Sequence, residues 1–249
     1  MRAAAASGSV RRVVYASTSG VSGIFTGASD RAVDTDAPAR EDAYATALAR
    51  RWPYYDTKIA AECRARKLAD ELRVELACLR PSLLLGPGDA RLSSCRSVLD
   101  LMRRAVPFVP GGGISFVDAR DVADAALSAA DVDLRARNGG ASYSRTYLLT
   151  AKNCSLGEYF GMVEAASGVP APKLRLPAPL AIAGARAATY ALAVLGRRDP
   201  SLDPVVVEMA QCFWGVDASR ARRELDFAPR APEDTVADTV AWLRRRHGL

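Results

Sequence analysis

Histidine is almost absent from this chain of 249 residues, and its single copy is His247, two residues before the end. Catalysis by a Ser-His-Asp or Cys-His arrangement, a histidine-rich metal site and a histidine proton shuttle are therefore nearly excluded. The five cysteines are scattered along the chain and form no CxxC pair. This spacing favours reduced thiols in an intracellular protein, and it predicts neither a disulfide framework nor a metal site.

Lysine is also scarce, because four of the 34 basic residues are lysines and the other 30 are arginines. The net charge is +6. Nucleic-acid binding would predict a basic stripe with interleaved aromatic residues, whereas these arginines are spread along the chain. The tightest run, Arg244 to Arg246, ends a helical pattern, where positive charge suits the helix dipole. We therefore expect a solvated basic surface and no nucleic-acid partner.

No apolar run predicts a signal peptide or a membrane span. The apolar run within residues 1–12 is too short for a signal peptide. Residues 176–195 are the most apolar stretch, but Arg186 lies in their middle and alanine dominates them. This stretch therefore predicts a buried or groove-lining helix and no membrane span.

Short apolar strands alternate with helices along the first 150 residues. Strands are predicted at 12–17, 74–79, 114–118 and 145–150, and helices at 53–72, 94–106 and 122–130. This alternation predicts an α/β protein with a partial Rossmann-like parallel sheet and flanking helices. The rest of the chain, with predicted helices at 178–195 and 232–246, predicts a small, helix-rich C-terminal lobe.

The strongest motif is YYDTK (residues 54–58), at the start of the first long predicted helix. Tyr54 and Lys58 are four residues apart, so both project from one helix face. A free tyrosine has a pKa of about 10, and a lysine ammonium one turn away favours the phenolate that a base at neutral pH requires. Thr18, at the end of the preceding strand, is the candidate hydroxyl that completes a site for moving a proton on or off a substrate oxygen.

Five ordered segments resemble the extended short-chain dehydrogenase/reductase family, which includes the NAD-dependent epimerases and dehydratases. The segments are VVYASTSGVSG (13–23), YYDTK (54–58), LRPSLLLGPGD (79–89), SFVDARDVADA (115–125) and RARRELDFAPR (220–230). In the last segment Asp226 stands where glycine is commoner in the family. The resemblance is nearest to the branch with members similar to dihydroflavonol reductase and 3β-hydroxysteroid dehydrogenase.

The resemblance implies a role for each part of the chain. Residues 1–150 would be the C-terminal half of a dinucleotide-binding Rossmann-like domain with substrate-lobe insertions. Residues 151–249 would be mainly the substrate-binding lobe. Tyr54 would be the acid/base, Lys58 would bind the nicotinamide ribose, and Thr18 would orient the substrate oxygen.

The resemblance also implies the residues that contact the cofactor, and it implies no metal ligand. Ser17 or Ser19 could replace Thr18 as the active hydroxyl. The implied cofactor-binding residues are Ser17, Tyr54, Lys58, Pro81, Ser82 and Leu83. The last three belong to the segment whose backbone touches the nicotinamide in the family.

The glycine-rich TGxxGxxG turn that holds the cofactor pyrophosphate in the family is not found in this sequence. The nearest candidate runs from Gly20 through Gly23 to Gly27, but its last gap is one residue too long and no amphipathic helix follows. Residues 1–17 resemble instead the end of a helix that leads into the fifth strand of the family's sheet. We therefore expect about four βα units to be missing upstream, and the strand at 12–17 to expose an apolar edge.

These features predict an NAD(P)-dependent oxidoreductase or epimerase that transfers a hydride at a carbinol or carbonyl carbon, with Tyr54 as the acid/base. The implied cofactor is NAD or NADP, held by the complete fold. The alternative is a truncated, non-catalytic fragment or a partner-dependent family member that cannot hold the dinucleotide. A second alternative, suggested by the arginine content alone, is an RNA-associated relative.

The expected partners are a small molecule bearing a hydroxyl or carbonyl group and, as an open option, a second copy of the chain in a homodimer. No membrane partner is expected. The expected compartment is the cytoplasm, with a plastid or another organelle left open because the first residues resemble the middle of a longer protein.

Overall fold

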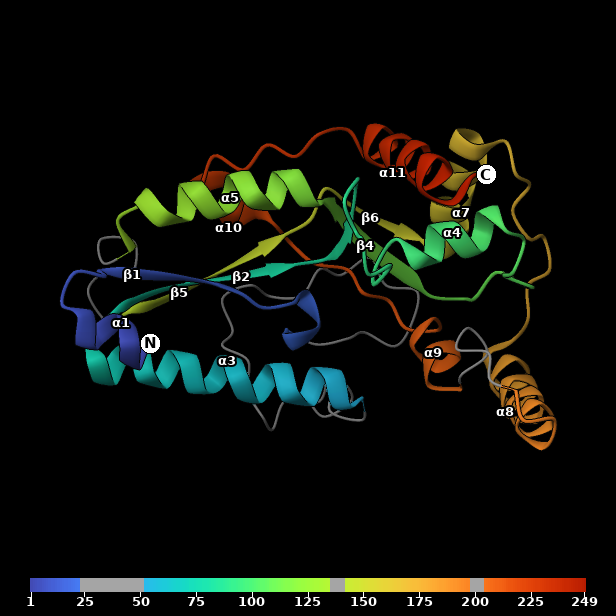
Figure 1. Ribbon diagram of the computed structural model, residues 1–249, viewed down its shortest axis with the longest axis horizontal. Helices are drawn as coiled ribbons and strands as arrows, with labels where there is room; N and C mark the ends of the chain where they lie inside the picture. The colour runs from blue at the N-terminus through green and yellow to red at the C-terminus, as the bar shows by residue number, and fades with distance from the viewer. Residues whose placement is uncertain (23–51, 135–141, 198–203) are drawn as a thin grey trace.

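The computed structural model describes residues 1–22, 52–134, 142–197 and 204–249 (Figure 1). Its first sheet contains β1 (Arg12–Ala16), β2 (Glu75–Pro81) and β5 (Ser144–Leu149), which are parallel and lie in the order β1-β2-β5. Every residue of β2 is buried. A central strand of a parallel sheet is covered on both faces, which explains the apolar run Leu76 to Leu79 in its middle.

Helices cover both faces of the first sheet. One face packs against α3 (Pro53–Leu72), and the other packs against α5 (Ala119–Asp131) and α10 (Ser219–Glu224) (Figure 1). Proline at the first position of α3 suits the start of a helix, because it has no N–H to leave unpaired. The predicted α/β class, with a parallel sheet and flanking helices, is confirmed.

The second sheet contains β3 (Leu83–Leu85), β4 (Gly113–Asp118) and β6 (Lys152–Ser155) in the order β3-β4-β6. β3 and β4 are parallel, whereas β4 and β6 are antiparallel. The sequence did not predict β6, because its four residues, KNCS, are mostly polar. β3 follows β2 after a single residue, so the two sheets are connected directly at Ser82.

Three helices build the core beside the second sheet: α4 (Arg96–Met102), α7 (Leu156–Ser167) and α11 (Pro232–His247). A capping box is present at the start of α7, where Ser155 and Glu158 satisfy each other's backbone N–H groups. The apolar stripe of α11 is fully buried, as its 3.6-residue spacing predicts. It consists of Val236, Val240 and Leu243.

The most apolar stretch forms α8 (Ala178–Val194), which packs beside the short helix α9 (Pro204–Met209). The expectation that this helix is buried is wrong for most of its length, since only Ala181 and Ala185 are buried. Leu180, at 62% exposure, is one of several large apolar side chains that face outward. The contact with α9 uses a narrow stripe of small side chains, which leaves the wider apolar surface uncovered. Among the described residues, no helix is both long enough and apolar enough to cross a membrane.

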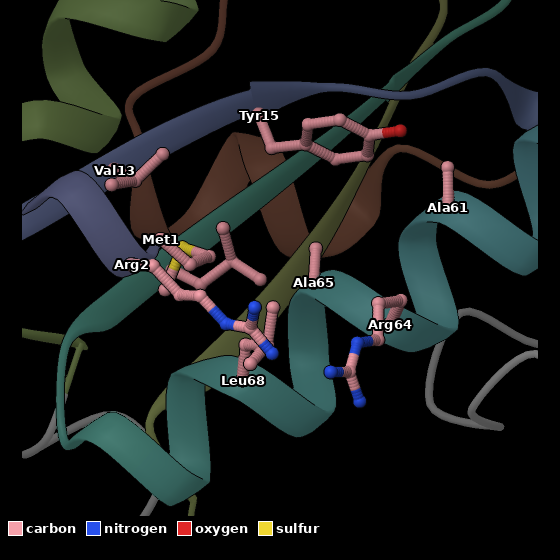
Figure 2. Close-up of a pocket in the computed structure, with 9 residues that line it drawn as sticks. Met1, Arg2, Val13, Tyr15, Ala61, Arg64, Ala65 and Leu68 are labelled. Atoms are coloured by element: carbon pink, nitrogen blue, oxygen red, sulfur yellow. The ribbon is translucent and has the colours of Figure 1, made fainter.

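A pocket of about 290 Å³ opens between β1, α3 and α1 (Arg2–Ser7) (Figure 2). Val13 and Tyr15 project into it from β1, and Ala65 and Leu68 project from α3. Within the described residues, β2 is the strand partner of β1 and the opposite edge of β1 is unpaired. The predicted apolar edge at 12–17 is therefore present in this structure.

Candidate functional site

Tyr54 and Lys58 lie in the first two turns of α3, as the spacing of the motif predicts. The Lys58 ammonium nitrogen lies 5.8 Å from the centroid of the Tyr54 ring, so the two side chains share one face of the helix. Tyr54 is 55% exposed and Lys58 is half-buried. The pair therefore combines an accessible phenol with a nearby cation.

The neighbouring Tyr55 has a different environment. Its ring is 5.2 Å from the Trp214 ring and 5.0 Å from the Tyr54 ring, measured between centroids. A methyl group added to Gly20 would lie 2.1 Å from the Tyr55 ring, so glycine is required where this ring packs. Burial, and then the neighbouring Tyr54, raises the pKa of Tyr55 well above its usual value. Tyr55 is thus a neutral packing residue, and Tyr54 is the accessible phenol of the two.

The turn after β1 carries the candidate hydroxyls. Thr18 precedes the short 3-10 helix η1 (Ser19–Val21), and its side-chain oxygen accepts a hydrogen bond from Gly20 N at 3.4 Å. A hydroxyl that accepts in this way keeps its own proton available for donation. η1 packs against α3, which brings the turn to the helix that carries Tyr54. Ser17 and Ser19 are both buried.

Ser17 extends the pairing of β1, since its N–H donates to Leu79 O at 2.8 Å. Its hydroxyl donates to a Glu62 carboxylate oxygen at 2.5 Å and is therefore engaged inside the protein. Thr18 is half-buried and lies next in the chain. Of the three predicted hydroxyls, the geometry thus favours Thr18 as the one that can meet an external molecule.

The end of β2 carries the other predicted cofactor contacts. Pro81 and Ser82 are buried, and Leu83 is half-buried. Ser82 donates to Leu149 O through both its N–H, at 3.0 Å, and its hydroxyl, at 3.1 Å. These two hydrogen bonds fix Ser82 against β5. Of the three residues, Leu83 has the most accessible side chain.

A buried ion pair beneath these segments was missed by the sequence reasoning. Glu62 of α3 and Arg80 of β2 are 0% and 1% exposed, and the guanidinium donates to both carboxylate oxygens. Two signals could have revealed the pair. Glu62 lies one turn after Lys58 on the same helix face, and Arg80 is a charge inside a buried apolar strand, which needs a partner.

The negative charge of Glu62 contributes to the raised pKa values of two neighbouring side chains. Burial, and then the carboxylate of Glu62, raises the pKa of the Cys78 thiol to about 12. Burial and then Glu62 also raise the pKa of Tyr15, whose ring extends from β1 over α3 in Figure 2. Both groups therefore stay neutral at physiological pH.

The elements that carry the candidate residues contact one another at the carboxyl ends of β1 and β2, and ligands of parallel α/β sheets bind at this edge. Half-buried Lys58 is a hydrogen-bond donor suited to ribose hydroxyls, and Leu83 offers an apolar contact for a nicotinamide ring. These residues fit the nicotinamide end of a dinucleotide. Gly20, in the candidate glycine-rich turn, instead packs against Tyr55, and Gly23 and Gly27 lie outside the described residues. In the part of the chain that the structure describes, no group of three His, Cys, Asp or Glu residues could hold a metal ion.

Sequence comparisons identify the family. Residues 1–141 match the model of the NAD dependent epimerase/dehydratase family. Two curated relatives are "Sterol demethylase protein B" of Methylococcus capsulatus and "Putative dihydroflavonol 4-reductase" of Synechocystis. The first is 31% identical over 70% of this chain and 51% of its own length. The second is 30% identical over 78% of this chain and 55% of its own length.

Solved structures share the fold. A crystal structure of gox2253 superposes with a TM-score of 0.72 at 24% identity, covering 97% of this chain and 68% of that one. A nucleoside-diphosphate-sugar epimerase from Pseudomonas aeruginosa gives a TM-score of 0.67 at 22% identity, covering 98% and 70%. The UDP-glucuronic acid 4-epimerase of Bacillus cereus, solved with NAD, gives 0.61 at 16%, covering 95% and 62%.

The fold and the matched motifs define a Rossmann-type α/β protein of the short-chain dehydrogenase/reductase class. Within that class, this chain belongs to the NAD-dependent epimerase/dehydratase family. The matched region contains the Thr18 turn, the Tyr54–Lys58 pair and the end of β2. The chain spans about half the length of the curated relatives that it matches.

Proposed function

We propose that this chain carries the proton-transfer residues of an NAD(P)-dependent oxidoreductase or epimerase that acts at a carbinol or carbonyl carbon. The observation that carries the proposal is the pairing of exposed Tyr54 with Lys58, 5.8 Å from its ring, at the N-terminal end of α3. Family membership supports the reaction class.

Tyr54 is the acid/base in this proposal. Its phenol gives a proton to the substrate oxygen during reduction of a carbonyl group, and it takes the proton back during oxidation of the alcohol. The positive charge of Lys58 stabilises the phenolate form that results. Thr18 donates a hydrogen bond to the same substrate oxygen and so holds it in reach of Tyr54.

The dinucleotide supplies the hydride acceptor or donor when it is bound. Lys58 would hold the ribose next to the nicotinamide through its ammonium group. Pro81, Ser82 and Leu83 would form the wall beside the nicotinamide, and Ser17 would support the turn that faces it. The rigid hydrogen bonding of Ser82 to Leu149 O supports this role, because a fixed wall keeps the reacting atoms aligned.

As the family pattern implies, residues 1–150 would contribute to dinucleotide binding, and residues 151–249 would contribute mainly to substrate binding. The substrate would be a small molecule with a hydroxyl or carbonyl group. A homodimer is compatible with the proposal.

Turnover in the presence of NAD or NADP and a panel of secondary alcohols tests this function, measured as absorbance of the reduced cofactor. We expect Tyr54→Phe to lower the rate by about 10²–10⁴-fold, the usual contribution of a positioned acid/base. Tyr143→Phe, at a half-buried tyrosine just before β5 and at the opposite end of the parallel strands from Tyr54, is the matched control and should leave the rate unchanged. Equal rates for the wild type and Tyr54→Phe would refute the proposed role.

A further inference from the structure

We propose that Glu62 is the positioning residue of the candidate site. Its buried carboxylate holds the turn that carries Thr18, and the strand end that carries Pro81 to Leu83, against the helix that carries Tyr54 and Lys58. This inference rests on the proposed function for its meaning, but the contacts that carry it are independent of any ligand.

The contacts of Glu62 reach both flanking segments. One carboxylate oxygen accepts the Ser17 hydroxyl at 2.5 Å, directly before Thr18 in the chain. Arg80 Nε donates to both carboxylate oxygens at 3.1 Å, directly before Pro81. A third hydrogen bond joins Arg80 Nη2 to the carboxylate. One side chain thus connects α3, the end of β1 and the end of β2.

Arg80 carries the connection further. Its Nη1 donates to the Ser22 hydroxyl at 2.8 Å, beyond the end of η1. The turn from Ser17 to Ser22 is therefore attached at both of its ends to the same ion pair. Thr18 lies between these two attachments, so its position depends on both.

Burial makes this connection rigid. The side chains of Glu62 and Arg80 are 0% and 2% exposed, and Arg66 adds a partly exposed cation at 3.9 Å from the carboxylate. Charges that are removed from water are stable only when their hydrogen bonds are complete. A shift of any of the three segments would break a bond to a buried charge. Displacement of any one segment would therefore leave a buried charge without part of its hydrogen bonding, which is costly.

The position of Glu62 along α3 links it to the reacting residues. It lies four residues after Lys58 and eight after Tyr54, on the same face of one helix. A helix is rigid over this length, so fixing Glu62 to β1 and β2 also fixes the height of Tyr54 and Lys58 above the strand ends. Glu62 thus affects the proposed reaction through the positions of Tyr54 and Lys58, without touching the substrate itself.

Hydrogen exchange measured by mass spectrometry on the full chain tests this inference without any cofactor. The variants are Glu62→Gln, which removes the charge at constant size, and Glu62→Asp, which keeps a carboxylate. Glu71→Gln, at a 47% exposed glutamate on the same helix, is the surface control. Val240→Ala, in the separate core beside α11, is the control for general loss of stability.

We expect Glu62→Gln to increase deuterium uptake at least about threefold in peptides that cover 17–22 and 80–85, with little change in α11. Glu62→Asp should give a smaller increase, and Glu71→Gln none. Val240→Ala should increase uptake mainly around α11. The inference is overturned if uptake in Glu62→Gln is unchanged, or if it rises to the same extent across the whole chain.

The affinity for NADH is a second readout, and it tests whether the contacts of Glu62 matter for the candidate site. If NADH binds to the wild type, Glu62→Gln should weaken that binding, whereas Glu71→Gln should not. Unchanged affinity in Glu62→Gln would contradict the positioning role. If NADH does not bind to the wild type, the proposed function fails, and the exchange pattern still decides whether Glu62 positions these segments.

Discussion

A double-mutant cycle on Glu62 and Arg80 measures how strongly the two buried charges depend on each other. Replacing Arg80 by methionine leaves the Glu62 carboxylate buried without its principal partner, and replacing Glu62 by methionine leaves the guanidinium in the same condition. Each single variant should lose about 3–5 kcal/mol of unfolding free energy, which is the usual cost of breaking a buried ion pair.

The double variant should be much less damaged than the two single losses together. Two methionines fill nearly the same volume without charge, and such replacements are often close to neutral. The remaining cost is the loss of partners for the hydroxyls of Ser17 and Ser22, about 1–3 kcal/mol. The coupling energy between the two positions should therefore be about 3 kcal/mol or more.

Urea unfolding followed by far-ultraviolet circular dichroism gives these free energies from the midpoint and slope of each transition. A parallel cycle on the exposed pair Lys67 and Glu71 should give a coupling of at most about 0.5 kcal/mol, since solvent screens it. Additive losses at Glu62 and Arg80, or a single loss below about 1 kcal/mol, would refute the reasoning from burial.

Three further predictions follow from the packing. Gly20→Ala should lower the unfolding free energy by about 1–3 kcal/mol, because the new methyl group meets the Tyr55 ring. Gly161→Ala, in an open position on α7, should instead raise it by about 0.5–1 kcal/mol. Equal melting temperatures for the two variants would contradict this prediction. A thiol reagent should modify one cysteine rapidly in the native protein, half-buried Cys63, and all five in urea; rapid modification of two or more would be inconsistent with the burial. The unfolding free energy should fall as the pH rises from about 9 towards 12. Burial raises the pKa of the Cys78 thiol to about 12 in the folded protein, whereas the same thiol in the unfolded chain ionises from about 9. A constant melting temperature over that pH range would contradict this prediction.

The regular elements could be predicted from the sequence where a strong local pattern coincides with burial. The predicted helix at 53–72 is present as α3 with the same bounds, and proline at its first position suits the start of a helix. The apolar stripe of α11 and the capping box of α7 are equally local patterns that packing supports. In these segments, local propensity and tertiary packing favour the same structure.

The misses have a common cause, which is that tertiary contacts decide them. β6 exists because it pairs with β4, although its residues have little strand propensity. The sequence of α8 is apolar enough for burial, yet its main neighbour is the short helix α9.

The candidate site was predictable in part. Tyr54 and Lys58 share a helix face because their spacing is local. The Ser17 hydroxyl, by contrast, is used by Glu62, a residue 45 positions later in the chain. Such a contact depends on how β1 packs against α3, and no local pattern encodes it.

Titration of this chain with NADH, followed by cofactor fluorescence, tests the central claim that the Tyr54–Lys58 face is a dinucleotide site. We predict saturable binding that Lys58→Met weakens about tenfold or more, which corresponds to losing one hydrogen bond from a charged group. Lys67→Met, at a 67% exposed lysine on the same helix, should bind like the wild type. Absence of saturable binding to the wild type, or equal affinities for the two lysine variants, would contradict the claim.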